Sequence, residues 1–204
     1  MSKLRRIVLV RHGETVGNSK VRFHGSGDVA LSEEGRSQMR EAAYRLRNEP
    51  FDLVLASPLE RSWEAAWIVS GGAPVRLEAG LREVHFGRWE GLTKAEIEAS
   101  DPILYADWQN KADGFEYPSG ERRAEFRARV EQSLSSLLDS GAASALLVIH
   151  KGVIRIMAEK LLGESLADGV PELGREVGLS RKGDGSWFLG RRSSNPPALD
   201  EQAA

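Results

Sequence analysis

Short runs of consecutive apolar residues alternate along the chain with segments whose apolar residues repeat at helical spacing. The runs lie within residues 4–10, 52–56 and 145–149, and each is rich in valine, isoleucine or leucine. Uninterrupted runs of this length are typical of strands that are buried on both faces of a parallel sheet. We therefore predict that these three segments form the centre of such a sheet.

Four segments place their apolar residues on one helical face. The first begins at Ser32, a residue type that caps helices, and has two glutamates in its first turn, where the helix dipole favours acids. The second carries Trp63 and Trp67 on its apolar face, and we expect both in the core. The third covers residues 119–138, and the fourth ends at Gly163. Alternating strands and helices predict an α/β fold, a mostly parallel sheet covered on both faces.

Two regions depart from this alternation. Residues 80–120 combine several aromatic residues with two prolines and short helical stretches, so we expect an insertion that folds over one edge of the sheet. Residues 176–180 and 186–190 flank a turn sequence and are predicted to pair as a hairpin or as edge strands. We predict one domain over residues 1–192 and a flexible tail over residues 193–204.

Composition excludes several classes of protein. The chain has 204 residues, no cysteine, and 28 basic against 30 acidic side chains, a formal net charge of −2. Zero cysteines exclude a disulfide scaffold, a zinc-thiolate site and a cysteine nucleophile. The near-zero charge argues against a nucleic-acid binder, and no apolar run approaches the roughly 20 residues of a membrane span. We expect a cytoplasmic protein that binds neither nucleic acid nor membrane.

Charged and polar side chains follow each predicted strand. Arg11 and His12 follow the first, Arg61 lies shortly after the second, and His150 and Lys151 follow the third. Ligands of open α/β sheets bind beyond the carboxyl ends of the strands. We therefore expect these side chains to converge at one edge of the sheet.

The residue types at this edge indicate phosphate chemistry. A fixed guanidinium beside a histidine repels a cation, which argues against a metal. Guanidinium groups bind phosphate through two hydrogen bonds, and a helix beginning after Gly13 would add backbone donors. We predict a phosphate site without metal or cofactor. His12 is then the candidate nucleophile, and Glu83 is the best candidate for the acid that protonates the leaving alkoxide.

Five motifs follow one another in order between residue 4 and about residue 162: Val10-Arg11-His12-Gly13-Glu14-Thr15, Leu31-Ser32-x-x-Gly35, Ser57-Pro58-Leu59-x-Arg61, Leu81-Arg82-Glu83 with Gly87-x-Trp89-Glu90-Gly91, and Val148-Ile149-His150. Together they resemble the histidine phosphatase superfamily, also called phosphoglycerate-mutase-like. The resemblance implies an α/β/α sandwich with a mixed, mostly parallel sheet. It also implies that His12 is phosphorylated in turnover and that Arg11, Arg61 and His150 hold the phosphoryl oxygens. Glu83 would be proton donor and then general base for water.

The resemblance also identifies candidate substrate contacts. Asn18 matches a position that often contacts the phosphoryl group. His24, next to Phe23, stands where glutamine is common, so this pair either touches the substrate or His24 is a loop histidine without a partner. Lys151 departs from the glycine that usually follows the second catalytic histidine. It either adds a cation that favours a substrate with a carboxylate or second phosphate, or it is a solvated lysine.

Two further groups of residues remain: the aromatic residues of the insertion and a charged stretch after it. Trp108, Phe115 and Tyr117 either line an apolar substrate pocket or pin the insertion to the sheet. The charged residues 122–129 are expected to form a solvated helix face.

The form of the acid motif separates two branches of the family. Phe86-Gly87-Arg88-Trp89-Glu90-Gly91 resembles the dephosphorylating members, whereas the cofactor-dependent mutases tend to be longer and usually show His-Gly-Asn after the central strand. We therefore expect a phosphatase that hydrolyses a small phosphorylated metabolite through a phosphohistidine. A phosphoglycerate mutase and a non-catalytic phospho-ligand binding protein are the alternatives. A homodimer is common among relatives.

Overall fold

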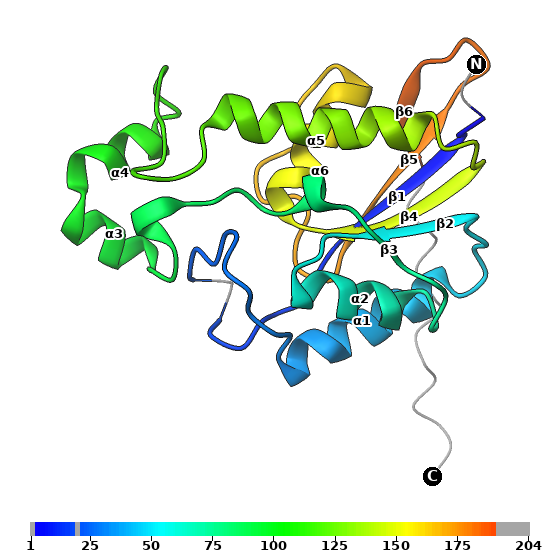
Figure 1. Cartoon of the computed structure of the whole chain (residues 1–204), viewed down its shortest axis with the longest axis horizontal. Coiled ribbons are helices and arrows are strands. Elements are labelled where there is room, and N and C mark those ends of the chain that lie inside the picture. Colours follow the sequence, from blue (N-terminus) through cyan, green and yellow to red (C-terminus); the bar gives the residue numbers. More distant parts are fainter. Residues whose placement is uncertain (1–2, 19–20, 191–204) are drawn as a thin grey trace.

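A six-stranded sheet forms the centre of the molecule (Figure 1), and the computed structural model describes residues 3–18 and 21–190. Its strands are β1 (Arg6–Arg11), β2 (Leu53–Ala56), β3 (Arg76–Leu77), β4 (Ser144–Ile149), β5 (Glu176–Arg181) and β6 (Trp187–Leu189). The order is β3-β2-β4-β1-β5-β6, in which β3, β2, β4 and β1 are parallel, β5 pairs antiparallel with β1, and β6 pairs antiparallel with β5. The three apolar runs are therefore central neighbours, as predicted.

Helices cover both faces of the sheet and complete the α/β/α sandwich. They are α1 (Glu33–Leu46) and α2 (Glu60–Val69) on one face, and α5 (Arg123–Leu138) and α6 (Lys151–Leu162) on the other. Side chains alternate between the faces of a strand. Val8 and Val10 of β1 accordingly pack in the cluster beneath α1 and α2, whereas Ile7 and Leu9 pack in the cluster beneath α5 and α6.

The ends of two helices agree with the sequence signals. Ser32 caps α1 by accepting a 3.0 Å hydrogen bond from the backbone N–H of Gly35. α6 ends at Gly163, whose φ of 78° lies in the left-handed region that glycine adopts without strain. Both helices consequently begin or end within a residue or two of where their patterns placed them.

The prediction that Trp63 and Trp67 are core residues is wrong. Their side chains are 43% and 58% exposed. α2 instead buries the adjacent face, because Arg61 and Ser62 both point inward and the Ser62 hydroxyl donates to the carbonyl of Val148 at 2.6 Å. That orientation turns both tryptophans outward, toward the edge of the sheet where Leu77 of β3 is also exposed.

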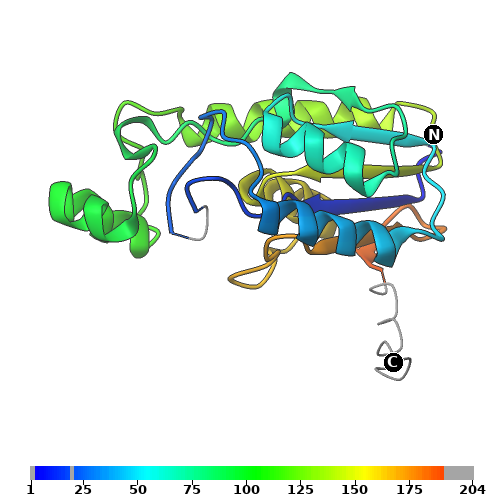
Figure 2. The same ribbon diagram turned by 90° about the horizontal axis from the view of Figure 1, so that it is seen from below.

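The segment between β3 and α5 lies beyond the carboxyl ends of the parallel strands. It contains the short 3-10 helices η1 (Ala79–Leu81) and η2 (Gly87–Trp89), and the helices α3 (Lys94–Ser100) and α4 (Pro102–Gln109). Figures 1 and 2 show α3 and α4 projecting past one end of the sheet. A small apolar cluster of its own, with Trp89 and Ile97 fully buried, holds this segment together.

The C-terminal strands form the predicted hairpin, and β5 also pairs with β1 in antiparallel orientation. The predicted tail over residues 193–204 lies outside the described residues. Among the helices that the structure describes, none is long and apolar enough to cross a membrane.

Candidate active site

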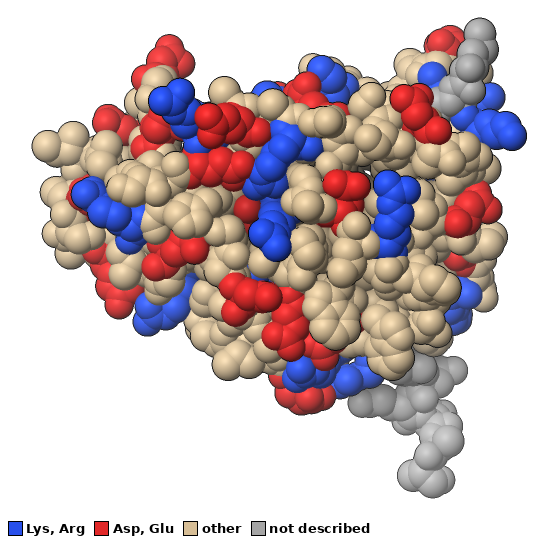
Figure 3. All heavy atoms as spheres, in the orientation of Figure 1, with Lys and Arg blue, Asp and Glu red and all other residues tan. Residues whose placement is uncertain are grey.

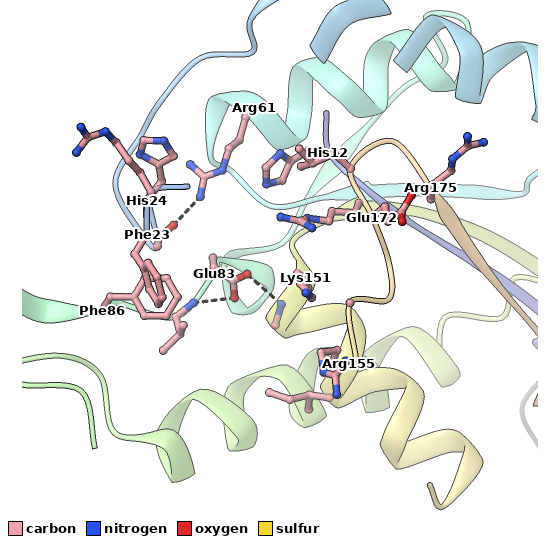
Figure 4. Close-up of a pocket in the computed structure, with 18 of the residues that line it drawn as sticks. His12, Phe23, His24, Arg61, Glu83, Phe86, Lys151, Arg155, Glu172 and Arg175 are labelled. Atoms are coloured by element: carbon pink, nitrogen blue, oxygen red, sulfur yellow. Dashed lines mark hydrogen bonds between the residues drawn. The ribbon is translucent and has the colours of Figure 1, made fainter. Parts of the chain in front are cut away.

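A cavity of about 1420 Å³ opens where β1, β2 and β4 end (Figure 4). Its lining includes Arg11, His12, Arg61 and Lys151, which the sequence predicted to converge, and Glu83, the candidate acid. The structure therefore brings together side chains from four separate segments of the chain. His150 lies directly behind His12, fully buried, with the two ring centroids 5.1 Å apart.

The ring of His12 is held in one orientation by its own neighbour. Nδ1 lies 2.7 Å from the carbonyl oxygen of Gly13, and because a carbonyl only accepts, Nδ1 carries the proton. Burial, and then the charges of Arg61 and Arg11, hold the pKa of His12 well below its ordinary value. The ring is therefore neutral near pH 7, and Nε2 presents an unprotonated lone pair.

Close backbone packing between Gly13 and Gly35 explains why two motifs carry glycine. A Cβ on Gly13 would overlap the carbonyl of Gly35, and a Cβ on Gly35 would overlap the carbonyl of Glu14. The loop after β1 thus rests directly on the first turn of α1. This contact fixes the backbone that carries His12. The predicted helix after Gly13 is not formed, because residues 14–17 instead make a turn and an isolated bridge to Leu31.

His150 sits at the N-cap of α6, and both of its ring nitrogens are buried without a hydrogen-bond partner among the described residues. Burial, followed by the charges of Arg61 and a neighbouring histidine, keeps the pKa of His150 well below its ordinary value. A neutral imidazole has one N–H donor and one acceptor nitrogen. A water molecule or a ligand atom that reaches these nitrogens can complete their hydrogen bonding.

Two guanidinium groups flank His12. Arg61, in the first turn of α2, donates to the carbonyls of Gly27 and Gly25 at 2.7 and 2.5 Å and is 2% exposed. Arg11 donates to the carbonyl of Pro171 at 3.2 Å, and its Nε is buried without a partner within the described ranges. Burial lowers the pKa of both arginines and Glu83 opposes this, but guanidinium stays charged in proteins.

The carboxylate of Glu83 is oriented by two backbone donors. The N–H of Val84 donates to Oε1 and the N–H of Gly152 to Oε2, each at 3.0 Å. The carboxylate lines the same cavity as Arg61 and lies near the start of α6 (Figure 4). It is placed for proton transfer to a group held between the arginines and itself.

Residues 122–125 and 127–128 are exposed, as expected for a solvated helix face, and Arg129 of α5 is the exception among the charged residues. Its guanidinium donates to the carbonyls of Gly80, Arg82 and Glu83 at 2.9, 2.6 and 3.1 Å. It also forms a 2.6 Å ion pair with Glu121. Arg129 therefore fixes the backbone that presents the Glu83 carboxylate.

Of the remaining predicted substrate contacts, two line the cavity and one does not. Phe23 and His24 line the cavity, and Nε2 of His24 is buried with no partner in the described part of the chain. Burial and the charge of Arg61 lower the pKa of His24, whereas a hydrogen bond to the backbone of Gly17 raises it. Asn18, by contrast, is exposed, has a φ of 65°, and is not among the residues that line the cavity.

Some aromatic residues of the insertion line the cavity, and others hold the insertion in place. Phe115 is buried in the small apolar cluster, where it pins the segment. Trp108 and Tyr117 line the cavity together with Phe23 and Phe86, packed edge to face with centroids 4.8 to 5.3 Å apart. Burial raises the pKa of Tyr117 to about 12, so its phenol stays neutral. One wall of the cavity is therefore aromatic.

Sequence reasoning missed the wall formed by residues 169–175. These residues precede β5, and the backbone N–H of Arg11 donates to the carbonyl of Arg175 at 3.1 Å. The signal was present in the strand at residues 176–181. Because that strand pairs antiparallel with β1, its beginning lies at the end of β1, and the preceding loop must then reach the cavity.

Positive charge is concentrated in the cavity. Of the described residues, ten lysines and arginines line it against five glutamates. Elsewhere both signs are interspersed, as the face in Figure 3 shows. The net charge of −2 is therefore an average that hides a cavity suited to anions.

A family profile described as histidine phosphatase superfamily (branch 1) matches residues 7–172. Glucosyl-3-phosphoglycerate phosphatase of Mycolicibacterium vanbaalenii is 33% identical over 195 residues, which cover 91% of this chain and 83% of that protein. Adenosylcobalamin/alpha-ribazole phosphatase of Salmonella typhimurium is 35% identical over 164 residues, covering 77% and 79%.

Solved structures agree with these sequence matches. The native structure of the mycobacterial glucosyl-3-phosphoglycerate phosphatase superposes with a TM-score of 0.78 at 30% identity, covering 94% of this chain and 100% of that one. The alpha-ribazole phosphatase from Shigella flexneri superposes with a TM-score of 0.78 at 27% identity, covering 93% and 96%.

Proposed function

The chain belongs to branch 1 of the histidine phosphatase superfamily, and we propose that it hydrolyses small phosphomonoesters through a phosphohistidine on His12. The observation that carries the proposal is the hydrogen bond from His12 Nδ1 to the Gly13 carbonyl. It leaves Nε2 of a neutral ring free, between two guanidinium groups that suit a phosphoryl dianion.

In the first step, Nε2 of His12 attacks phosphorus in line with the ester oxygen. The N–P bond forms as the P–O bond breaks, and Glu83 gives its proton to the departing alkoxide. Arg11 and Arg61 neutralise the phosphoryl oxygens, and the N–H of neutral His150 donates to one of them. The products of this step are the alcohol and phosphorylated His12.

In the second step, water attacks the phosphohistidine. Glu83, now ionised, takes a proton from the water as its oxygen bonds to phosphorus, and the N–P bond breaks. Inorganic phosphate leaves and the neutral ring of His12 is restored. Glu83 is again protonated, so the cycle closes with one ester and one water consumed.

The similar proteins support a small phosphorylated metabolite as substrate. Their names place glucosyl-3-phosphoglycerate and alpha-ribazole phosphate among the substrates of relatives, and both are phosphomonoesters of ring-bearing alcohols or their derivatives. In this chain the aromatic wall at Phe23, Phe86 and Trp108 faces the same cavity and can pack against the alcohol part. We propose in addition that the protein is cytoplasmic. We also propose that it forms a homodimer, and sedimentation equilibrium tests that oligomeric state.

A panel of phosphomonoesters tests the activity. We expect hydrolysis of aryl and alkyl esters, release of inorganic phosphate, and no requirement for a bisphosphorylated primer. Phosphoglycerate mutase-like protein 4 of Arabidopsis thaliana is 32% identical over 160 residues, so mutase activity is the competing outcome. Transfer of phosphate between hydroxyls with primer dependence would show a mutase, and no turnover at all would indicate a binding protein.

A further inference from the structure

Lys151 is a cation of the cavity that the proposed two-step reaction does not use. It occupies the first position of α6, directly after His150, and its side chain is half-buried in the cavity lining. In the described part of the chain no carboxylate forms an ion pair with its ammonium. Lys151 is therefore a wall residue of the cavity without an acidic partner among the described residues that neutralises it.

The neighbours of Lys151 are mostly cations. Burial, followed by the charges of Arg11, Arg155 and Lys94, lowers the pKa of Lys151, and only Asp168 opposes them. Asp168 is itself shared, since it lies 3.7 Å from the Arg155 guanidinium and 3.6 Å from the Lys111 ammonium. In the part of the chain that the structure describes, Lys151 itself is left without an ion pair among like charges, and a bound anion would offset that repulsion.

Lys151 borders the phosphoryl pocket, and other cations continue from it along the cavity wall. It follows His150 directly in the sequence, and Arg11 is the foremost of the charges that act on it. Arg155 and Lys94 come next; both line the cavity, and neither takes part in the proposed reaction. The positive charge therefore extends from the phosphoryl pocket into the part of the cavity that is left for the leaving group.

Two nearby acids do not fill this place. Glu159, about two turns further along α6, pairs with the Arg127 guanidinium at 3.0 Å. Glu83 is held by two backbone N–H groups and serves the reaction. The ammonium of Lys151 is thus left for an anion that arrives with the substrate.

We propose that Lys151 forms a second anion subsite, which binds a carboxylate or second phosphate carried by the leaving group. The proposal rests on the phosphatase function proposed above. It defines the substrate class as phosphomonoesters whose leaving group carries a second anionic group. Lys94, on the first turn of α3 with its ammonium 5.7 Å from the Trp108 ring centroid, extends the positive charge toward the aromatic wall.

Matched substrates test the subsite. We would measure kcat/KM for 3-phosphoglycerate against glycerol 3-phosphate, which differ by a carboxylate, and for fructose 1,6-bisphosphate against fructose 6-phosphate, which differ by a phosphate. The wild-type protein should prefer the doubly anionic member of at least one pair, and the pair that responds identifies the anion. Lys151→Met should reduce that preference about tenfold, through KM, while Lys151→Arg should keep most of it.

Lys160→Met is the matched control, because Lys160 lies on the same helix, is exposed, and pairs with Glu131 outside the cavity. It should leave the preference unchanged. A wild-type protein without preference in either pair would overturn the subsite, a result that needs no variant. An equal decrease in kcat/KM for all esters in Lys151→Met would overturn it as well, because it would show that Lys151 contacts the phosphoryl group that all the substrates share. Absence of turnover even on an aryl phosphate would instead reject the phosphatase function.

Discussion

The backbone N–H of Gly152 donates to Oε2 of Glu83 at 3.0 Å, so the residue that follows Lys151 also orients the proposed acid. Gly152 and Glu83 are 69 positions apart in the sequence. Their contact connects the start of α6 to the segment after η1. The Glu83 carboxylate is thereby held in the lining of the cavity (Figure 4).

Replacing Gly152 with alanine should displace this carboxylate. A Cβ there would lie 2.5 Å from Glu83 Oε1 and 3.2 Å from the ring of Phe126. We expect kcat for alkyl phosphates to fall by about tenfold or more, and kcat for aryl phosphates to fall much less, since a phenolate leaves without a proton. Gly183→Ala is the control, because a Cβ at Gly183 meets open space. Equal losses on both ester classes would show that Glu83 is not the acid.

Arg129 is a positioning residue for Glu83, and its removal should have a related effect. Arg129→Met loses three hydrogen bonds to the carbonyls of residues 80, 82 and 83. We expect kcat on alkyl phosphates to fall by about tenfold, with KM little changed and aryl phosphates less affected. Arg122→Met, at the exposed start of the same helix, should have no such effect. A variant with a lower Tm but an unchanged alkyl-to-aryl ratio would assign Arg129 a purely structural role.

The free energy of unfolding should decrease as the pH falls, because His12 and His150 are buried in their neutral form. Burial lowers the pKa of His12 and His150 well below 6.5 in the folded protein. Below pH 6.5 the unfolded chain therefore binds more protons, and the free energy of unfolding decreases as pH falls toward the folded pKa values. The slope should approach about 1.4 kcal/mol per pH unit for each histidine.

Urea unfolding between pH 7 and pH 5 measures this slope, and His150→Gln should reduce it by removing one of the two groups. An unchanged slope in His150→Gln would contradict the neutral state of the buried ring. The same argument predicts that protonation of His12 does not lower kcat/KM near pH 6.5, because its ring is still neutral at that pH.

The sequence predicted the central sheet and the convergence of Arg11, His12 and His150 because both depend on local signals. Continuous apolar runs identify strands buried on both faces, and the parallel arrangement then places Arg11, His12 and His150 at one edge. The glycine at position 35 needed the structure for its explanation. Its backbone supports the His12 loop, a contact between segments that no single motif reveals.

Other features could not be read from the sequence. The helical pattern of α2 fits two neighbouring faces, and the inward-pointing Arg61 and Ser62 decide against the tryptophans. In the sequence, Arg129 cannot be distinguished from an arginine on a solvated helix face. Its role becomes clear only from the backbone carbonyls to which it donates. Residues 169–175 carry no motif, and only the antiparallel pairing of β5 brings them to the cavity.

Rapid quenching of the reaction, followed by mass spectrometry under alkaline conditions that preserve phosphohistidine, tests the central claim most directly. Wild-type protein mixed with an aryl phosphate should carry one phosphoryl group on His12, and His12→Ala should carry none and lose turnover. His85→Ala, at an exposed histidine outside the cavity lining, should retain both. Turnover that persists in His12→Ala, or a phosphoryl group found on another residue, would contradict the mechanism.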